Sequence, residues 1–157
     1  KILLIMKDSR MGAYGTIGLI LLLLLKFYCL WQLASVDLWK SGVLVVLANA
    51  LSRYVAVLLR IKLDYVREQD ESKAKPIARQ TRLKDYCIAA AFAFLPFLLQ
   101  NSYWALMVLV PLFLLVIYLR WYFTKWIGGY TGDCLGATQQ LSELVIYLFY
   151  LALWNYT

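Results

Sequence analysis

The sequence has 157 residues, of which 63% are apolar, and it contains six Trp and twelve Tyr. Its mean hydropathy of +0.68 excludes an ordinary soluble domain and indicates a polytopic membrane protein. The formal charge of +7, with no His, does not indicate a nucleic-acid partner, because the basic residues lie between apolar segments and so report topology.

Five apolar stretches, in chain order, predict the membrane segments of an all-α bundle. They cover residues 14–33, 42–61, 86–99, 103–119 and 141–156, with lengths near or below the roughly 20 residues that a spanning helix needs. The third is short and contains Pro96, so we expect either a short helical hairpin with the fourth or a re-entrant segment. We therefore predict a single transmembrane domain over residues 1–157.

The basic residues mark one side of the membrane. Lys and Arg concentrate in residues 1–10, 60–84 and 120–125, whereas the alternate loops hold only Lys40 or none. The positive-inside rule makes the first set cytoplasmic. We predict a multi-pass protein of a bacterial or archaeal cytoplasmic (inner) membrane, with its functional site facing the cytoplasm.

A glycine-rich turn with a carboxylate, GGYTGDCLGA at residues 128–137, separates the fourth and fifth stretches. Polar residues continue from it at the 3.6-residue period of a helix, and we call this set the polar stripe. The polar stripe consists of Asp133, Gly136, Gln140, Glu143 and Tyr147. A carboxylate at or inside a membrane is costly unless it is paired, hydrated or bound to a cation, so the stripe predicts a site.

Two interpretations of this turn remain open on spacing alone. Mg²⁺ takes carboxylate and phosphate oxygens, with Asp133 and Glu143 as ligands, while Gly129 and Gly132 allow backbone amides to approach a phosphate. Alternatively, Thr131 or Asp133 is a helix N-cap and Glu143 pairs with a neighbouring Arg.

Two cations lie within the first two apolar stretches. Arg53 is about 12 Å inside the predicted cytoplasmic end at 1.5 Å per residue. Its guanidinium needs an anion, which is either Glu143 or Asp133 or a substrate phosphate held bidentately. Lys26 is expected to extend its ammonium toward the outer surface.

A second polar segment, MKDSRMGAYG at residues 6–15, precedes the first apolar stretch. It supplies an acid and two cations, Asp8, Lys7 and Arg10, next to glycines that allow close helix packing. As a short pattern, it is also compatible with capping and membrane anchoring alone.

Taken together, the two segments resemble one family, the membrane-bound cobalamin synthases (adenosylcobinamide-GDP ribazoletransferases). Residues 6–15 are similar to the family's M-K-D-S-R-x-G-[ST]-[FY]-G segment. Residues 128–137 are similar to its G-G-x-T-G-D-x-L-G-A turn, and Gln140 and Glu143 match the Q-x-x-E pattern that follows. The resemblance covers essentially the whole chain.

The resemblance implies a Mg²⁺-dependent transfer of the phosphocobinamide moiety of adenosylcobinamide-GDP to α-ribazole or its 5′-phosphate, with release of GMP. The chemistry requires charge neutralisation at the leaving phosphate, which carboxylate-bound metal and basic side chains supply. Its implied catalytic residues are Asp8 and Asp133, and its implied metal ligands are Asp8, Asp133 and Glu143. The implied phosphate-binding residues are Lys7, Arg10, Arg53, Gly129 and Gly132.

One departure from the family limits what the chain does alone. Members carry an Asp-rich D-G-x-A-D-x-x-D-G type motif before the M-K-D-S-R segment, and this sequence has none and begins with Lys1. We expect a C-terminal portion of a longer enzyme, inactive as a lone polypeptide. Its protein partner is expected to be either the upstream half or a second copy.

Two alternatives belong to other groups of proteins. A CDP-alcohol phosphotransferase would share the chemistry, but its D-G-x-x-A-R type signature is absent. A non-catalytic membrane subunit or a small-solute transporter would use Arg53, Asp133 and Glu143 as a buried ion-pair network.

Overall fold

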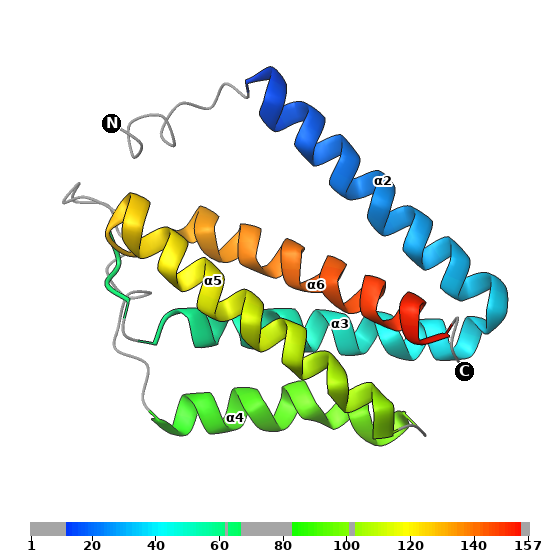
Figure 1. Ribbon diagram of the computed structural model, residues 1–157. Helices are drawn as coiled ribbons and strands as arrows, with labels where there is room; N and C mark the ends of the chain where they lie inside the picture. The colour runs from blue at the N-terminus through cyan, green and yellow to red at the C-terminus, as the bar shows by residue number, and fades with distance from the viewer. Residues whose placement is uncertain (1–11, 62, 67–82, 101–102, 155–157) are drawn as a thin grey trace.

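The computed structural model describes residues 12–61, 63–66, 83–100 and 103–154, and within these ranges the chain is helical with no β-strand (Figure 1). The all-α membrane bundle predicted from the sequence is confirmed. Its α-helices are α2 (Ala13–Val36), α3 (Leu38–Leu59), α4 (Leu83–Phe94), α5 (Leu109–Ile127) and α6 (Gly132–Trp154). Two 3₁₀ helices, η1 (Leu95–Leu99) and η2 (Tyr103–Val108), lie between α4 and α5.

Three of the described helical segments are long and apolar enough to cross a membrane. These are α2, α3 and the continuous segment Trp104–Ile127, with mean hydropathies of 2.0, 1.9 and 2.1. α6 is also 23 residues long, but it carries the polar stripe. The helix begins at Gly132. The apolar stretch predicted for it began only at residue 141, because polar residues occupy the first turns of the helix.

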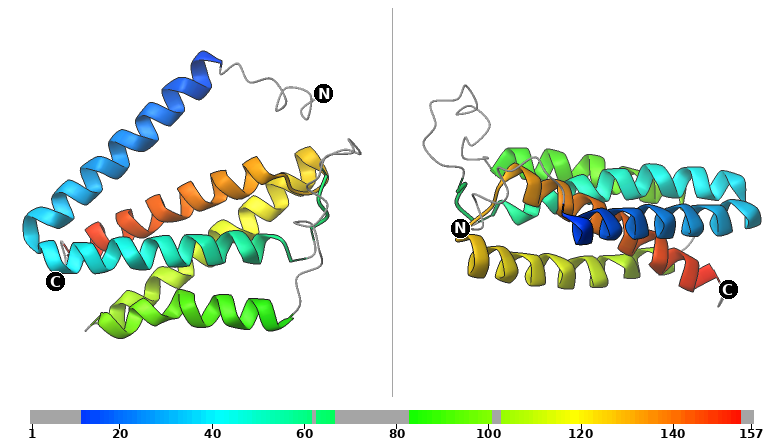
Figure 2. Two further views of the ribbon diagram at one scale, coloured as in Figure 1. Left: turned by 180° about the vertical axis from the view of Figure 1, so that it is seen from behind. Right: turned by 90° about the horizontal axis from the view of Figure 1, so that it is seen from above.

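The third and fourth predicted segments correspond to α4 with η1 and to η2 with α5, and the choice between a hairpin and a re-entrant segment stays a prediction. α4 ends at Phe94 and tightens into η1, whose first turn contains the buried Pro96. Proline is tolerated in the first turn of a helix and disfavours continuation of the α-helix before it. From this end of the bundle, α5 crosses α3 and diverges from α4 (Figures 1 and 2).

α3 lies at the centre of the bundle and contacts α2, α4, α5 and α6. Its leucines Leu44, Leu47 and Leu51 are at most 1% exposed and form one core with Leu112 of α5 and Ile146 of α6. A smaller cluster, centred on Leu59, Phe123 and Tyr130, lies at the C-terminal end of α3. We call that end of the bundle, where α3 and α5 end and α6 begins, the glycine-turn end.

α2 and α3 meet at a one-residue corner. Asp37 follows α2 and caps α3, accepting a hydrogen bond from the Lys40 backbone N–H at 3.0 Å, and it forms an ion pair with Lys40 Nζ at 3.3 Å. The hydrogen bond from Lys40, with its charge, lowers the pKa of the Asp37 carboxyl. The C-terminal end of α2 is therefore fixed to the start of α3 at this corner.

Away from the corner, α2 departs from the rest of the bundle (Figures 1 and 2). Its buried residues are Cys29 and Leu33, both in its second half, whereas Tyr14 near its start is 92% exposed. Added Cβ atoms at Gly15 and Gly18 would meet nothing within 4 Å in the described structure. Only the second half of α2 is packed against the described helices.

Candidate functional site

The glycine turn begins by ending α5. Gly128 has a positive φ of 79° and donates its N–H to the carbonyls of Phe123 and Thr124, both at 3.1 Å. This left-handed residue after the last helical turn is the usual helix terminator, and glycine adopts it without steric cost. The chain is thereby redirected toward the start of α6.

The next residues are fixed against the segment that follows α3. Tyr130 N–H donates to the Asp64 carbonyl at 3.0 Å, and Val66 N–H donates to the Tyr130 carbonyl at 3.1 Å. A Cβ on Gly129 would collide with the Asp64 carbonyl and the Val66 side chain. Gly129 is therefore required by packing, and its predicted phosphate contact stays a prediction.

Thr131, and not Asp133, is the N-cap of α6. Its Oγ1 accepts the Cys134 backbone N–H at 3.4 Å, and its carbonyl accepts from Leu135 N–H at 3.2 Å. Asp133 thus remains exposed in the first turn, beside an exposed Gly132 at which an added Cβ meets nothing. Within the described residues, no hydrogen bond or ion pair engages the Asp133 side chain.

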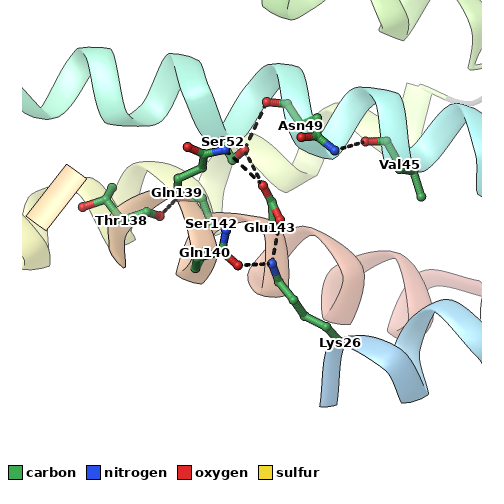
Figure 3. Close-up of polar contacts among 9 residues, drawn as sticks. All are labelled: Lys26, Val45, Asn49, Ser52, Thr138, Gln139, Gln140, Ser142 and Glu143. Atoms are coloured by element: carbon green, nitrogen blue, oxygen red, sulfur yellow. Dashed lines mark hydrogen bonds and ion pairs between the residues drawn. The ribbon is translucent and has the colours of Figure 1, made fainter. Parts of the chain in front are cut away.

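The other carboxylate of the polar stripe, Glu143, is buried and paired (Figure 3). Lys26 Nζ of α2 lies 2.6 Å from Glu143 Oε2 and donates to Gln140 Oε1 at 2.7 Å. The side chains of Lys26 and Glu143 are 12% and 10% exposed. The pair joins α2 to α6 in the middle of both helices.

The second oxygen of Glu143 contacts α3 and its own helix (Figure 3). The Ser52 hydroxyl lies 3.2 Å from Glu143 Oε1 and 3.1 Å from the Asn49 carbonyl. Gln139 Nε2 donates to the same Glu143 oxygen at 3.4 Å. Three helices therefore satisfy one carboxylate, and we call Lys26, Glu143, Ser52, Gln139 and Gln140 the Glu143 network.

The prediction that Lys26 extends to the outer surface is wrong. Ten residues separate Lys26 from the end of α2 at Val36, which is about 15 Å of helix, beyond the reach of its side chain. The ammonium pairs with Glu143 instead. A lone lysine near the middle of an apolar span, opposite a helix with a central carboxylate, was the signal in the sequence.

The expectation that Glu143 pairs with an arginine is also wrong, because its cation is Lys26. Arg53 lies next to Ser52 on the exposed side of α3, and the described residues give it no hydrogen-bond or ion-pair partner. The ion-pair network of Arg53, Asp133 and Glu143 expected for a transporter is therefore not the one observed.

The predicted metal ligands do not converge within the described residues. Asp133 and Glu143 are ten residues apart on α6, or about 15 Å, too far to share one ion. No group of three or more His, Cys, Asp or Glu side chains suited to a metal occurs in the described ranges. The predictions for Lys7, Asp8 and Arg10 fall outside the described residues, as does most of the basic segment 60–84.

Comparison with known families gives the context of this geometry. The family model described as cobalamin-5-phosphate synthase matches residues 1–151. The chain belongs to the cobalamin-5-phosphate synthase family. The resemblance found in its two sequence motifs is thereby confirmed. The Glu143 network lies in a chain of this family.

Relatives in the curated proteins are named adenosylcobinamide-GDP ribazoletransferase. Those from Shewanella piezotolerans and Shewanella frigidimarina are 44% and 45% identical and align with 94% of this chain. The relative from Leptospira interrogans is 42% identical over 99% of the chain. The chain spans 57% of the length of each Shewanella relative and 61% of the Leptospira relative. No solved structure matches the chain.

The Glu143 network generates a prediction about stability. Lys26→Met leaves a buried carboxylate without its cation, and we expect the free energy of unfolding to fall by about 3–5 kcal/mol. Glu143→Gln should cost a comparable amount. The double variant removes both charges, so its loss should be much smaller than the sum, as measured by thermal or denaturant unfolding in detergent. Additive losses would contradict the pairing.

The glycine turn generates a second prediction. Gly129→Ala places a methyl group against the Asp64 backbone, and overpacking of this kind costs about 1–3 kcal/mol. We expect a lowered melting temperature in the same detergent. Gly132→Ala is the matched control, because its added Cβ meets nothing and should leave the melting temperature unchanged or raised. Equal melting temperatures for the two variants would disprove the packing requirement at Gly129.

Proposed function

We propose that this chain is part of an adenosylcobinamide-GDP ribazoletransferase. The reaction transfers the phosphocobinamide moiety of adenosylcobinamide-GDP to α-ribazole or its 5′-phosphate and releases GMP. The observation that carries the proposal is the family match over residues 1–151, combined with relatives of that name. Because the chain spans only part of those relatives, we propose that the complete activity needs the remainder.

The metal proposed for this reaction is Mg²⁺, and Asp133 is the described residue that fits it. Mg²⁺ is commonly bound through one or two protein carboxylates together with substrate phosphates and water. Asp133 is exposed, engaged by no described side chain, and placed at the start of α6 beside the open Gly132. When bound, Mg²⁺ would supply charge neutralisation at the diphosphate.

In this proposal, different residues of the chain have different roles. The helix dipole of α6 and a metal held by Asp133 would both favour a diphosphate at the glycine-turn end, and this supports the proposed position. Arg53, exposed and unpaired within the described helices, binds a phosphate oxygen deeper along α3. Lys7, Arg10 and Asp8 would act from the segment before α2. The Glu143 network holds α2 against α6 beneath this region.

The proposed location is a bacterial or archaeal inner membrane, with the glycine-turn end at the cytoplasmic side. Arg60 and Lys125 lie at this end, whereas the corner at the opposite end carries Lys40 beside Asp37. Excess basic charge on one side supports a cytoplasmic assignment of that side.

The experiment that tests this function measures GMP release from adenosylcobinamide-GDP and α-ribazole 5′-phosphate. Membranes would contain this chain alone, or this chain joined to the upstream part of the Shewanella piezotolerans relative. We expect release from the joined protein only, and only with Mg²⁺. No release from the joined protein, when it is membrane-inserted and stable, would overturn the proposal.

Within the joined protein, Asp133→Asn should reduce turnover by at least about 100-fold, because it removes charge stabilisation at the reacting phosphates. Its melting temperature should stay unchanged, since the Asp133 side chain is exposed. Asp37→Asn is the control. It removes a carboxylate charge at the opposite end of the bundle, and asparagine can still cap α3. Equal activities of the two variants would remove Asp133 from the site.

A further inference from the structure

An apolar groove of about 630 Å³ lies between α3, the end of α4 and α5, away from the Glu143 network. This volume is within the range of ligand pockets, about 300–1,000 Å³. Its walls are formed by aliphatic and aromatic side chains, including Leu51, Val55 and Leu58 of α3 and Leu112 of α5. Among the described residues of the lining, Arg120 alone has a charged side chain.

The groove has the length of one membrane leaflet. Its lining runs from Leu51 to Ile61 along α3 and from Leu109 to Arg120 along α5. At 1.5 Å per residue these segments are about 15 Å and 16 Å long. The hydrocarbon core of a bilayer is about 30 Å thick, so the lined part of each helix is about as long as one leaflet is thick.

Arg120 lies at the end of this groove nearer the glycine-turn end, about 10 Å of helix before Ile127, and its long side chain can extend from there to the interface. The following turn of α5 carries an aromatic cluster that includes Trp121 and Trp126, and Lys125 Nζ lies over the Trp121 ring, 4.7 Å from its centroid. Tryptophan, tyrosine and lysine at a helix end mark the head-group region. Arg120 is half-buried at that level, and no hydrogen bond or ion pair from the described residues satisfies its guanidinium.

The groove is also open at the surface of the described bundle. Val110, Phe113 and Leu114 form its outer edge and are 61%, 66% and 61% exposed. Figures 1 and 2 show α5 crossing α3 at an outer side of the bundle and diverging from α4. A nucleotide or a corrinoid carries many polar groups that this lining cannot satisfy, whereas an alkyl chain needs none.

We propose that this groove binds one acyl chain of an anionic phospholipid, and that Arg120 binds the lipid phosphate. The apolar lining buries the chain over one leaflet, and the single cation at the interface end selects a negatively charged head group. The site is separate from Asp133 and from the Glu143 network. It makes the protein dependent on the composition of one leaflet.

The test is native mass spectrometry of the full 157-residue chain, released from micelles that contain equal amounts of phosphatidylglycerol and phosphatidylcholine with the same acyl chains. We expect about fivefold more bound phosphatidylglycerol, the effect of one basic residue near the surface. Arg120→Gln should abolish this preference. Leu58→Trp, which fills the groove, should reduce the binding of both lipids.

Matched controls separate the groove from the general membrane surface. Lys125→Gln removes a cation from the same interface outside the groove lining, and Ile117→Trp adds the same bulk to a residue of α5 that is exposed and outside the lining. Both controls should bind lipid as the unmodified chain does. Preference retained in Arg120→Gln, or lost equally in Lys125→Gln, would overturn the role of Arg120. Equal lipid binding by Leu58→Trp and Ile117→Trp would overturn the groove.

Discussion

The carboxylate of Glu143 is the constraint on which the arrangement of the helices depends. A charge in the middle of a membrane bundle must be neutralised and hydrogen-bonded, since hydrocarbon offers it nothing. Lys26 supplies the charge from α2, and Ser52 supplies a hydroxyl from α3. α3 and α6 already share one apolar core, and the network ties α2 to both of them. α2 depends on this tie, because its only fully buried residues are Cys29 and Leu33.

The same helix that carries Glu143 also carries the exposed carboxylate at its start. The glycine turn ends α5 and packs through Gly129 against the segment after α3. Thr131 caps α6, so the Asp133 side chain is not needed as the helix cap. The polar stripe therefore divides into a structural half, Gln140 and Glu143, and an accessible half at Asp133 and Gly136. In the proposed reaction, the accessible half is the part available to a phosphorylated substrate.

Much of the fold could be predicted from the sequence, because apolar stretches of spanning length and the placement of Lys and Arg follow directly from the properties of the bilayer. The helical periodicity of the polar stripe was also predictable. The partner of Glu143 was not: periodicity describes one helix, whereas the pairing with Lys26 depends on which helices meet, and 117 residues separate the two side chains. Pro96 left two arrangements open for the same reason, since its ring stops a helix without fixing where the chain goes next.

The most direct test of the central role of the Glu143 network is the distance between α2 and α6 measured by electron paramagnetic resonance. Spin labels would replace the exposed residues Phe27 and Leu148, with the exposed Cys87 changed to Ser. We expect a narrow distance distribution in the protein with an intact network and a broad one in Lys26→Met. Equally narrow distributions in both proteins would show that other contacts hold α2 and that the Glu143 network does not.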